Sequence, residues 1–170
     1  KHQEMLGIYN SQSPLPRGTR MLASWPWCAA FVSTVSLQCG LRDVMPTECG
    51  CPGMVRLYQE IGRWAEDDAY IPSPGDVIFY DWQDTGYGDN AGQPDHVGIV
   101  TACDGQTMTI IEGNCDNAVK TRSLAVNARF IRGFGIPDFA SKADGADPQP
   151  APEPAPEPAP EPTPTPTPQP

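Results

Sequence analysis

The sequence has few histidines and no excess of basic residues, and both shortages limit its chemistry. Only two histidines, His2 and His96, occur among 170 residues, so few imidazoles are available as a base or as metal ligands. Eleven Lys and Arg stand against 21 Asp and Glu, which gives a net charge of −10. Because binding to phosphate backbones needs a basic patch, this balance argues against nucleic acid as a partner. An apolar run of about 18 residues is also missing, so no membrane-spanning helix is predicted.

Large apolar side chains are absent from residues 147–170, which consist of Ala-Pro-Glu-Pro and Thr-Pro repeats. Such a segment cannot bury enough apolar surface to offset the entropy of ordering, and its prolines favour an extended spacer. We therefore predict one domain over residues 1–140 and a disordered Pro/Glu/Thr-rich linker over residues 141–170. Because the sequence starts at Lys1 and ends inside a repeat, we expect a removed signal peptide or a further C-terminal module.

The six cysteines are too few and too irregularly spaced for a disulfide-framework miniprotein. Cys39, Cys49 and Cys51 lie close together in the sequence and leave three alternatives open. They form a zinc site, although their spacing is not that of a zinc ribbon, or two of them form one disulfide, or all are free thiols.

The first half of the chain has helical patterns. We predict helices over His2–Tyr9, over Pro26–Cys39 with Gly40 closing it, and over Gly53–Trp64, since Pro at the start and Gly just past the end are typical of helices. The apolar residues that recur at helical spacing, and are expected to be buried, are Ala30, Phe31, Val35, Leu37, Met54, Leu57, Tyr58 and Ile61.

The second half has strand patterns separated by turn residues. The predicted strands are Asp76–Trp82, Asp95–Thr101, Thr107–Glu112, Val119–Leu124 and Phe130–Ile136. A Gly- and Asp-rich loop over residues 83–94 joins the first two, and Asp104-Gly105 marks a turn between the next two. Helices followed by an antiparallel sheet of about five to six strands predict an α+β fold.

Cys28 lies in the first turn of the second predicted helix. Unpaired amides and the helix dipole favour an anion there, so the pKa of this thiol should fall and the amides could stabilise an oxyanion. The alternative is a buried structural cysteine. A cysteine nucleophile needs a base, and His96 starts a strand directly after the acidic loop, whereas His2 lies at the terminus. The alternative for His96 is a structural or surface histidine.

Glu112 and Asn114 are candidates for orienting His96, because alternate residues of a strand point to one face. The position of the loop between these two strands decides which residue lies opposite His96. A three-residue loop over Asp104–Gln106 pairs Asn114 with His96, and moving the loop back by one residue pairs Glu112 with His96. Either group could hold the tautomer of the imidazole. A two-residue turn would place Gly113 opposite His96 and remove this arrangement, and solvated strand ends are the remaining alternative.

The acidic loop also offers oxygen atoms to a metal. Its candidate calcium ligands are Asp81, Asp84, Asp89, Asn90 and Asp95. Their spacing fits no EF-hand, and Gly-rich acidic loops are usually solvated, so we predict no metal and no cofactor.

Four segments resemble the successive blocks of CHAP-family domains, which are cysteine- and histidine-dependent amidohydrolases and peptidases of bacteria and their phages. The segments are residues 24–33, 74–80, 94–100 and 111–114, in the order of the family, and the similarity extends over nearly all of residues 5–138.

This resemblance implies a papain-like α+β fold and cleavage of amide bonds in peptidoglycan. It assigns the family's nucleophile to Cys28, its histidine to His96, and its glutamate and asparagine to Glu112 and Asn114. Some relatives bind calcium ahead of the cysteine, but residues 10–24 contain no Asp or Glu, so this site is not expected here.

The expected function is peptidoglycan hydrolysis, in the first place by an N-acetylmuramoyl-L-alanine amidase. An endopeptidase and a catalytically silent wall-binding module are the alternatives. Trp27 and Trp82 are candidate substrate-binding residues, each with core or edge packing as the alternative. We expect a monomer that acts outside the cell or in the bacterial cell wall, or that is released at lysis if a phage encodes it.

Overall fold

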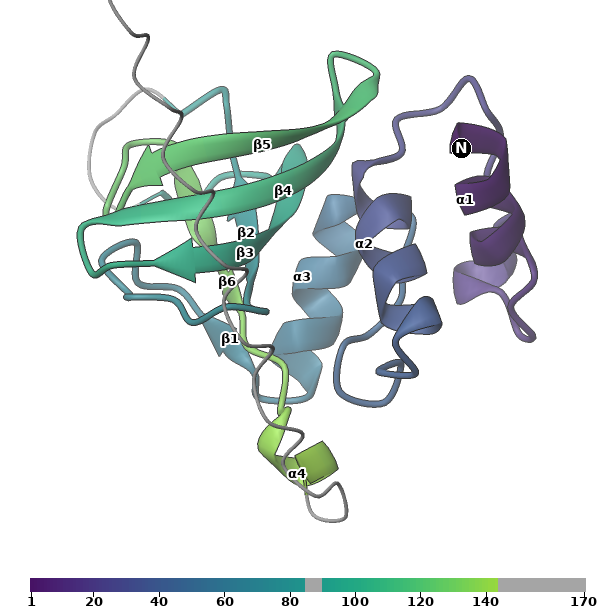
Figure 1. Cartoon of the computed structure of the whole chain (residues 1–170), viewed down its shortest axis with the longest axis horizontal. Helices are drawn as coiled ribbons and strands as arrows, with labels where there is room; N and C mark the ends of the chain where they lie inside the picture. The colour runs from purple at the N-terminus through teal and green to yellow at the C-terminus, as the bar shows by residue number, and fades with distance from the viewer. Residues whose placement is uncertain (85–89, 144–170) are drawn as a thin grey trace, which may run out of the picture.

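The computed structural model describes residues 1–84 and 90–143, in which all the longer helices precede the sheet (Figure 1). The helical half holds α1 (His2–Asn10), the 3-10 turn η1 (Pro16–Gly18), α2 (Cys28–Gln38) and α3 (Cys51–Glu60). The strands are β1 (Trp64–Ala65), β2 (Val77–Tyr80), β3 (His96–Cys103), β4 (Thr107–Cys115), β5 (Ala118–Ala125) and β6 (Ile131–Gly135), and a short helix α4 (Ala140–Ala143) follows. The predicted α+β fold with N-terminal helices is confirmed.

Helix α2 is the central helix, with α1 on its outer side and α3 and the sheet on its inner side (Figure 1). This position buries more of α2 than the single predicted face. Val32, Ser33 and Ser36 are fully buried, whereas Phe31, Val35 and Leu37 are only partly buried. The buried hydroxyls are satisfied, because Ser33 and Ser36 donate hydrogen bonds to the carbonyl groups of Glu48 and Met45.

Helix α3 is shorter than predicted and ends at Glu60 instead of Trp64. Gly62 has a φ of 67°, a left-handed conformation that glycine adopts easily and that stops the helix. Ile61, predicted to be buried, is therefore 50% exposed just past the helix, and Val55 is buried in its place. Trp64 starts the unpredicted strand β1 instead.

All neighbouring strands are antiparallel, in the order β1-β6-β2-β3-β4-β5. Side chains alternate between two apolar clusters, one on each face of the sheet. Val77, Phe79 and Val97 pack against α2 and α3, whereas Ile78 and Tyr80 pack on the opposite face with residues of β4 and β6. Both faces are buried around β2 and β3, so the sheet rigidly fixes the residues at their ends.

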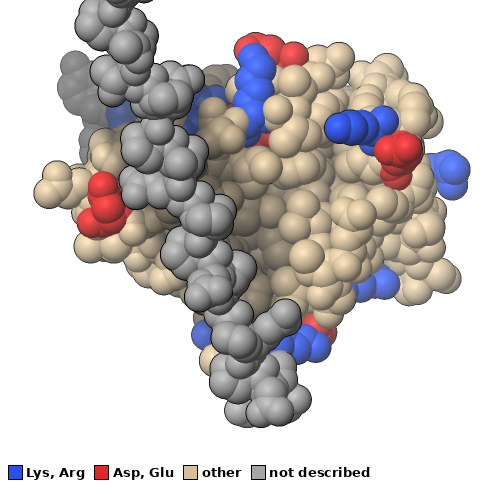
Figure 2. Space-filling model, viewed as in Figure 1, with Lys and Arg blue, Asp and Glu red and all other residues tan. Residues whose placement is uncertain are grey.

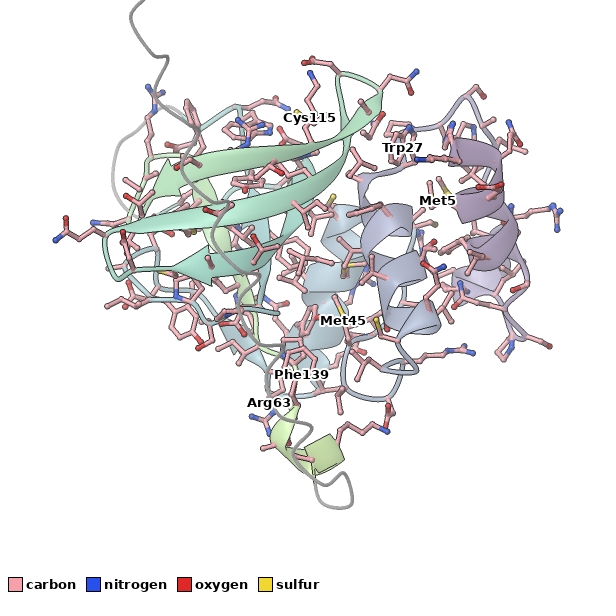
Figure 3. The ribbon with its side chains drawn as sticks, in the orientation of Figure 1. Met5, Trp27, Met45, Arg63, Cys115 and Phe139 are labelled. Atoms are coloured by element: carbon pink, nitrogen blue, oxygen red, sulfur yellow. The ribbon has the colours of Figure 1, made fainter. Side chains whose placement is uncertain are left out.

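Residues after β6 return toward the helical half. Arg63, which follows α3, forms an ion pair with Asp138, and the ring of Phe139 covers Gly75 (Figure 3). The predicted linker over residues 141–170 falls almost entirely outside the described residues. Among the described residues, none of the helices has the length and apolar character that a membrane span requires.

Candidate active site

Cys28 is the first residue of α2 and is 5% exposed. The preceding residue, Trp27, provides no side-chain cap, and the first helical hydrogen bond runs from the Phe31 amide to the Trp27 carbonyl. The amides of the first turn are therefore not used within the helix. They lie around a sulfur atom that the helix dipole stabilises as an anion.

A second thiol lies beside it. Cys51 is the first residue of α3, and its sulfur is 3.7 Å from that of Cys28. All six cysteines, which lie within the described residues, are free thiols, so the hypothesis of a disulfide among Cys39, Cys49 and Cys51 is wrong. The proximity of this second thiol was not predicted, although Gly50-Cys51-Pro52 places a cysteine at a helix start just as Pro26-Trp27-Cys28 does.

Both thiols line a groove of about 480 Å³. Its wall includes Arg17, Trp25 and Asp95, with Pro26, Pro52 and Pro94 adding apolar surface. Trp25 is 43% exposed and presents its ring at this wall of the groove. The buried nucleophile candidate is thus accessible from one side, and the groove is wide enough for a peptide or sugar unit.

His96 is the first residue of β3 and is held by ring contacts on its own face of the sheet. Its ring stacks on Tyr80 at 5.7 Å between centroids and lies 6.4 Å from that of Trp82. Its Nε2 atom lies 3.4 Å from Oε2 of Glu112, in an ion-pair contact without the alignment of a hydrogen bond. The start of β3 thus brings the imidazole between Cys28 and Glu112.

The register of β3 and β4 explains how Glu112 reaches His96. Glu112 pairs with Gly98, as the first predicted register requires, and lies diagonally across from His96. Near the turn, Ala102 pairs with Thr109, which is shifted by one residue from this register. A β-bulge between Val100 and Ala102 removes the shift, so the register holds from Val100 back to Gly98. Gly98 leaves room for Glu112, because a Cβ atom there would lie 2.6 Å from a methyl group of Ile110 and 2.9 Å from Cγ of Glu112.

Glu112 has no exposed surface and is neutralised by Arg122 of β5, a residue that sequence reasoning missed. Nε and one terminal nitrogen of Arg122 donate hydrogen bonds of 2.7 and 3.0 Å to the two carboxylate oxygens. The guanidinium also lies 4.9 Å from the ring centre of Trp82. Only the pairing of β4 with β5 brings Arg122 here, and the sequence does not specify that register.

The electrostatics favour a charged triad. The hydrogen-bond contact with the Cys51 thiol, contacts with His96 and the Ala29 amide lower the pKa of Cys28 to about 5, against the effect of burial. Burial alone would lower the pKa of His96, but Cys28 and Glu112 raise it to about 9. Burial opposes ionisation of Glu112, yet His96 and Arg122 lower its pKa to about 2. These shifts favour a thiolate, an imidazolium and a carboxylate as the charged forms of the three groups.

The other predicted site residues lie farther out. Asn114 is half-buried in a bulge of β4 with a φ of 61°, and its side chain forms no hydrogen bond with any described residue. Trp27 is buried between α1 and α2 near Met5 (Figure 3), and its indole donates a hydrogen bond to Asn117. Trp82 is half-buried on Tyr80 and Arg122. Neither tryptophan lines the groove, and their substrate-binding role stays a prediction.

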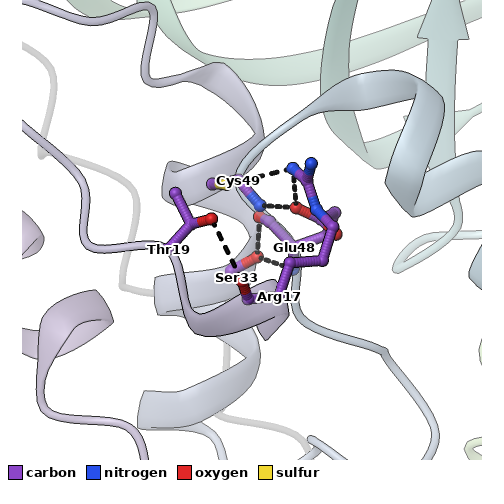
Figure 4. Close-up of polar contacts among 5 residues, drawn as sticks. All are labelled: Arg17, Thr19, Ser33, Glu48 and Cys49. Carbon is purple, nitrogen blue, oxygen red and sulfur yellow. Dashed lines mark hydrogen bonds and ion pairs between the residues drawn. The ribbon is translucent and has the colours of Figure 1, made fainter. Parts of the chain in front are cut away.

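A second buried carboxylate stabilises the wall of the groove (Figure 4). Glu48 accepts two hydrogen bonds, of 2.7 and 2.8 Å, from Arg17. The Ser33 hydroxyl donates to the backbone carbonyl of Glu48 and accepts from its backbone amide. Gly53 in the first turn of α3 leaves room for this carboxylate, because a Cβ atom there would lie 2.8 Å from Oε2. The network joins η1, α2 and α3 around the two thiols.

Within residues 1–84 and 90–143, no group of three or more His, Cys, Asp or Glu is arranged to hold a metal ion. The zinc alternative for Cys39, Cys49 and Cys51 therefore has no structural support. Of the candidate calcium ligands, Asp89 lies outside the described residues, while Asp81 and Asp95 accept hydrogen bonds from backbone amides.

Comparison with known proteins agrees with this geometry. The family model of the CHAP domain matches residues 20–114, which include Cys28, His96 and Glu112. The chain belongs to the CHAP family. CHAP domains are cysteine- and histidine-dependent amidohydrolases and peptidases that act on peptidoglycan.

Among solved structures, the CHAP chain is similar to the crystal structure of Ly7917, at 15% sequence identity and a TM-score of 0.43. The similar region covers 66% of this chain and 53% of that chain, so it spans about half the length of Ly7917. No curated protein matches the chain.

Proposed function

We propose that this CHAP chain is an N-acetylmuramoyl-L-alanine amidase in which Cys28 is the nucleophile and His96 the acid and base. The observation that carries the proposal is that three elements bring a thiol, an imidazole and a carboxylate together, with the thiol of Cys28 lining the groove. Helix α2 supplies a thiol with a lowered pKa, β3 supplies the imidazole, and β4 supplies the carboxylate that charges it. No step of the proposed reaction is assigned to Trp27, Trp82 or Asn114.

The proposed reaction is acyl transfer through a thioester. The Cys28 thiolate attacks the carbonyl carbon of the amide, and the free amides at the start of α2 stabilise the negative oxygen that forms. The imidazolium of His96 then gives its proton to the leaving amine as the carbon–nitrogen bond breaks. Neutral His96 next takes a proton from water, which attacks the thioester and releases the carboxylic acid and the thiolate. Glu112 stabilises the imidazolium in both steps without itself being protonated.

Trp25 supports cleavage next to the sugar instead of farther along the peptide. Its large exposed ring lies in the groove with Cys28, on a wall otherwise rich in proline. Such a ring suits the apolar face of a pyranose, and the amide at N-acetylmuramic acid is the wall amide that adjoins a sugar. On the face shown in Figure 2, the charged side chains that are visible lie mostly near the rim.

The decisive experiment is the digestion of purified cell walls by the wild type and by Cys28→Ala. The wild type should release intact stem peptides with free L-alanine amino ends, as identified by mass spectrometry. Peptides cut internally would instead show an endopeptidase. Cys28→Ala should abolish lysis with nearly unchanged thermal stability, because the change removes one sulfur atom from the edge of the groove. A folded wild type that binds walls without new chain ends would indicate a silent binding module.

We also propose the wider organisation of the chain. Residues 1–140 form the catalytic domain and residues 141–170 a linker, because the proline repeats have no apolar side chains with which to build a core. The proposed protein is a monomer that acts outside the cytoplasm, because CHAP domains act on peptidoglycan.

A further inference from the structure

Cys51 lies beside the proposed nucleophile, yet the proposed reaction does not use it. Its sulfur is 3.7 Å from that of Cys28, both residues are 5% exposed, and both line the groove. Each is also the first residue of a helix, so the starts of α2 and α3 are in contact through these two sulfurs. This contact requires an account of its own.

The groups around the two sulfurs make them unequal. Cys28 faces the imidazole of His96 and the amide of Ala29, which both stabilise a negative sulfur. The nearby Cys28 sulfur, burial and the negative charge of Asp95 all raise the pKa of Cys51. Arg17, the cation in the wall of this groove, is already bound to Glu48. Cys28 is therefore the thiolate of the pair, and Cys51 remains a thiol with a proton to donate.

Cys28 is also the sole hydrogen-bond partner that the structure gives the Cys51 sulfur within the described part of the chain. A buried thiolate that loses one of its donors is left poorly compensated, because hydrogen bonds to charged groups are the stronger ones. We propose that Cys51 is a positioning residue, whose S–H group donates a hydrogen bond to the Cys28 thiolate and fixes this sulfur at the groove. The inference rests on the proposed function, since it assigns Cys51 a task only if Cys28 is the nucleophile.

Alkylation of the folded protein by iodoacetamide tests this directly, with peptide mass mapping to count only the adduct at Cys28. In Cys51→Ala the pH midpoint of alkylation should rise, and the rate at about pH 6 should fall about 10-fold. Cys51→Ser keeps a donor and should recover part of the rate. Cys49→Ser is the matched control, because Cys49 lines the same groove but contacts Arg17, and it should leave the midpoint unchanged.

Three results would overturn the inference. They are an unchanged midpoint in Cys51→Ala, equal shifts in Cys51→Ala and Cys51→Ser, and a Cys28–Cys51 disulfide in the active wild-type protein. Since alkylation needs no cell wall, its outcome is separate from the lysis test. A chain without lysis that still shows the midpoint shift would refute the proposed function and leave the hydrogen bond in place.

Discussion

The helical half and the sheet half of the molecule each contain an arginine paired with a buried glutamate. In the helical half Arg17 binds the buried Glu48, and in the sheet half Arg122 binds the buried Glu112. Each arginine donates two hydrogen bonds of 2.7 to 3.0 Å to its carboxylate. Each also places a terminal nitrogen near a cysteine sulfur, at 3.3 Å for Cys49 and 3.7 Å for Cys115.

The difference lies in what else each carboxylate contacts. Glu48 accepts a hydrogen bond from the Cys49 amide and packs against Gly53 at the start of α3. The ion pair of Arg17 with Glu48 therefore holds backbone segments in place. Glu112 contacts the imidazole of His96, so its pair fixes a charge state. A buried carboxylate with an arginine is therefore not by itself a catalytic feature, and the third partner decides its role.

Glu112→Gln should have the largest effect of the variants that separate these roles. The amide keeps the shape of the side chain but not the charge that raises the pKa of His96, so lysis should fall roughly 100-fold. In the proposed reaction the imidazolium is the acid, so wild-type lysis should decline as the pH rises through about 9. The pKa of His96 falls in the variant, so this alkaline limb should move to lower pH in a pH–rate profile.

Glu48→Gln is the control for that profile, because Glu48 has no contact with His96 in the described structure. If it moved the alkaline limb as far as Glu112→Gln does, the contrast between the two carboxylates would be lost.

Arg17→Gln should affect stability more than chemistry. It leaves the carboxylate of Glu48 buried without its cation, which should cost about 2 kcal/mol in the free energy of unfolding. Burial opposes ionisation of Glu48, but Arg17 and the Cys49 amide lower its pKa below the usual 4.5, so the ion pair stabilises above that pH. The difference from wild type in urea unfolding should therefore shrink as the pH falls below 4.5.

Undiminished stability of Arg17→Gln at neutral pH would contradict the architectural role. The alkaline limb of the pH–rate profile of Arg17→Gln should lie at the same pH as that of the wild type, because Arg17 contacts the groove wall and not His96.

Arg122→Lys should have the smallest effect. Lysine keeps the positive charge beside Glu112 but loses the two parallel hydrogen bonds and the planar contact with Trp82, so lysis should fall by roughly three- to tenfold. Arg122→Met also removes the charge and should be clearly worse when both are assayed at neutral pH. Equal activity of the two variants would show that the positive charge does not matter.

Patterns with a strong local cause were predicted correctly. The proline and glycine that bracket α2, the alternating strands and the order of helices before sheet follow from backbone preferences that act within a few residues. Cys28 at a helix start and His96 at a strand start are local features of this kind. Of the two registers that the sequence left open, the one with the three-residue loop agrees with the Gly98–Glu112 pairing near the site, although a bulge in β3 restores it and the described pairing does not include His96 with Asn114.

The sequence-based predictions that were incomplete concern residues whose surroundings come from distant parts of the chain. The predicted face of α2 is only part of its buried surface, because α1, α3 and the sheet cover the helix from several sides. Ala30 is buried as predicted, but so are the polar Ser33 and Ser36, which find carbonyl partners in the following loop. Arg122 and Cys51 were missed as site residues because strand pairing and helix packing bring them in from a distance.

The sequence by itself determined the types of secondary structure, their order, and the residues with nucleophilic and basic chemistry, because side-chain identity and local backbone preference are sufficient for these. Only the tertiary structure decided the charges. It placed Cys51 and His96 beside Cys28, and Arg122 behind Glu112, and an ionisable group changes its pKa only through neighbours within a few ångströms and through loss of water. Those neighbours come from helices and strands far apart along the chain.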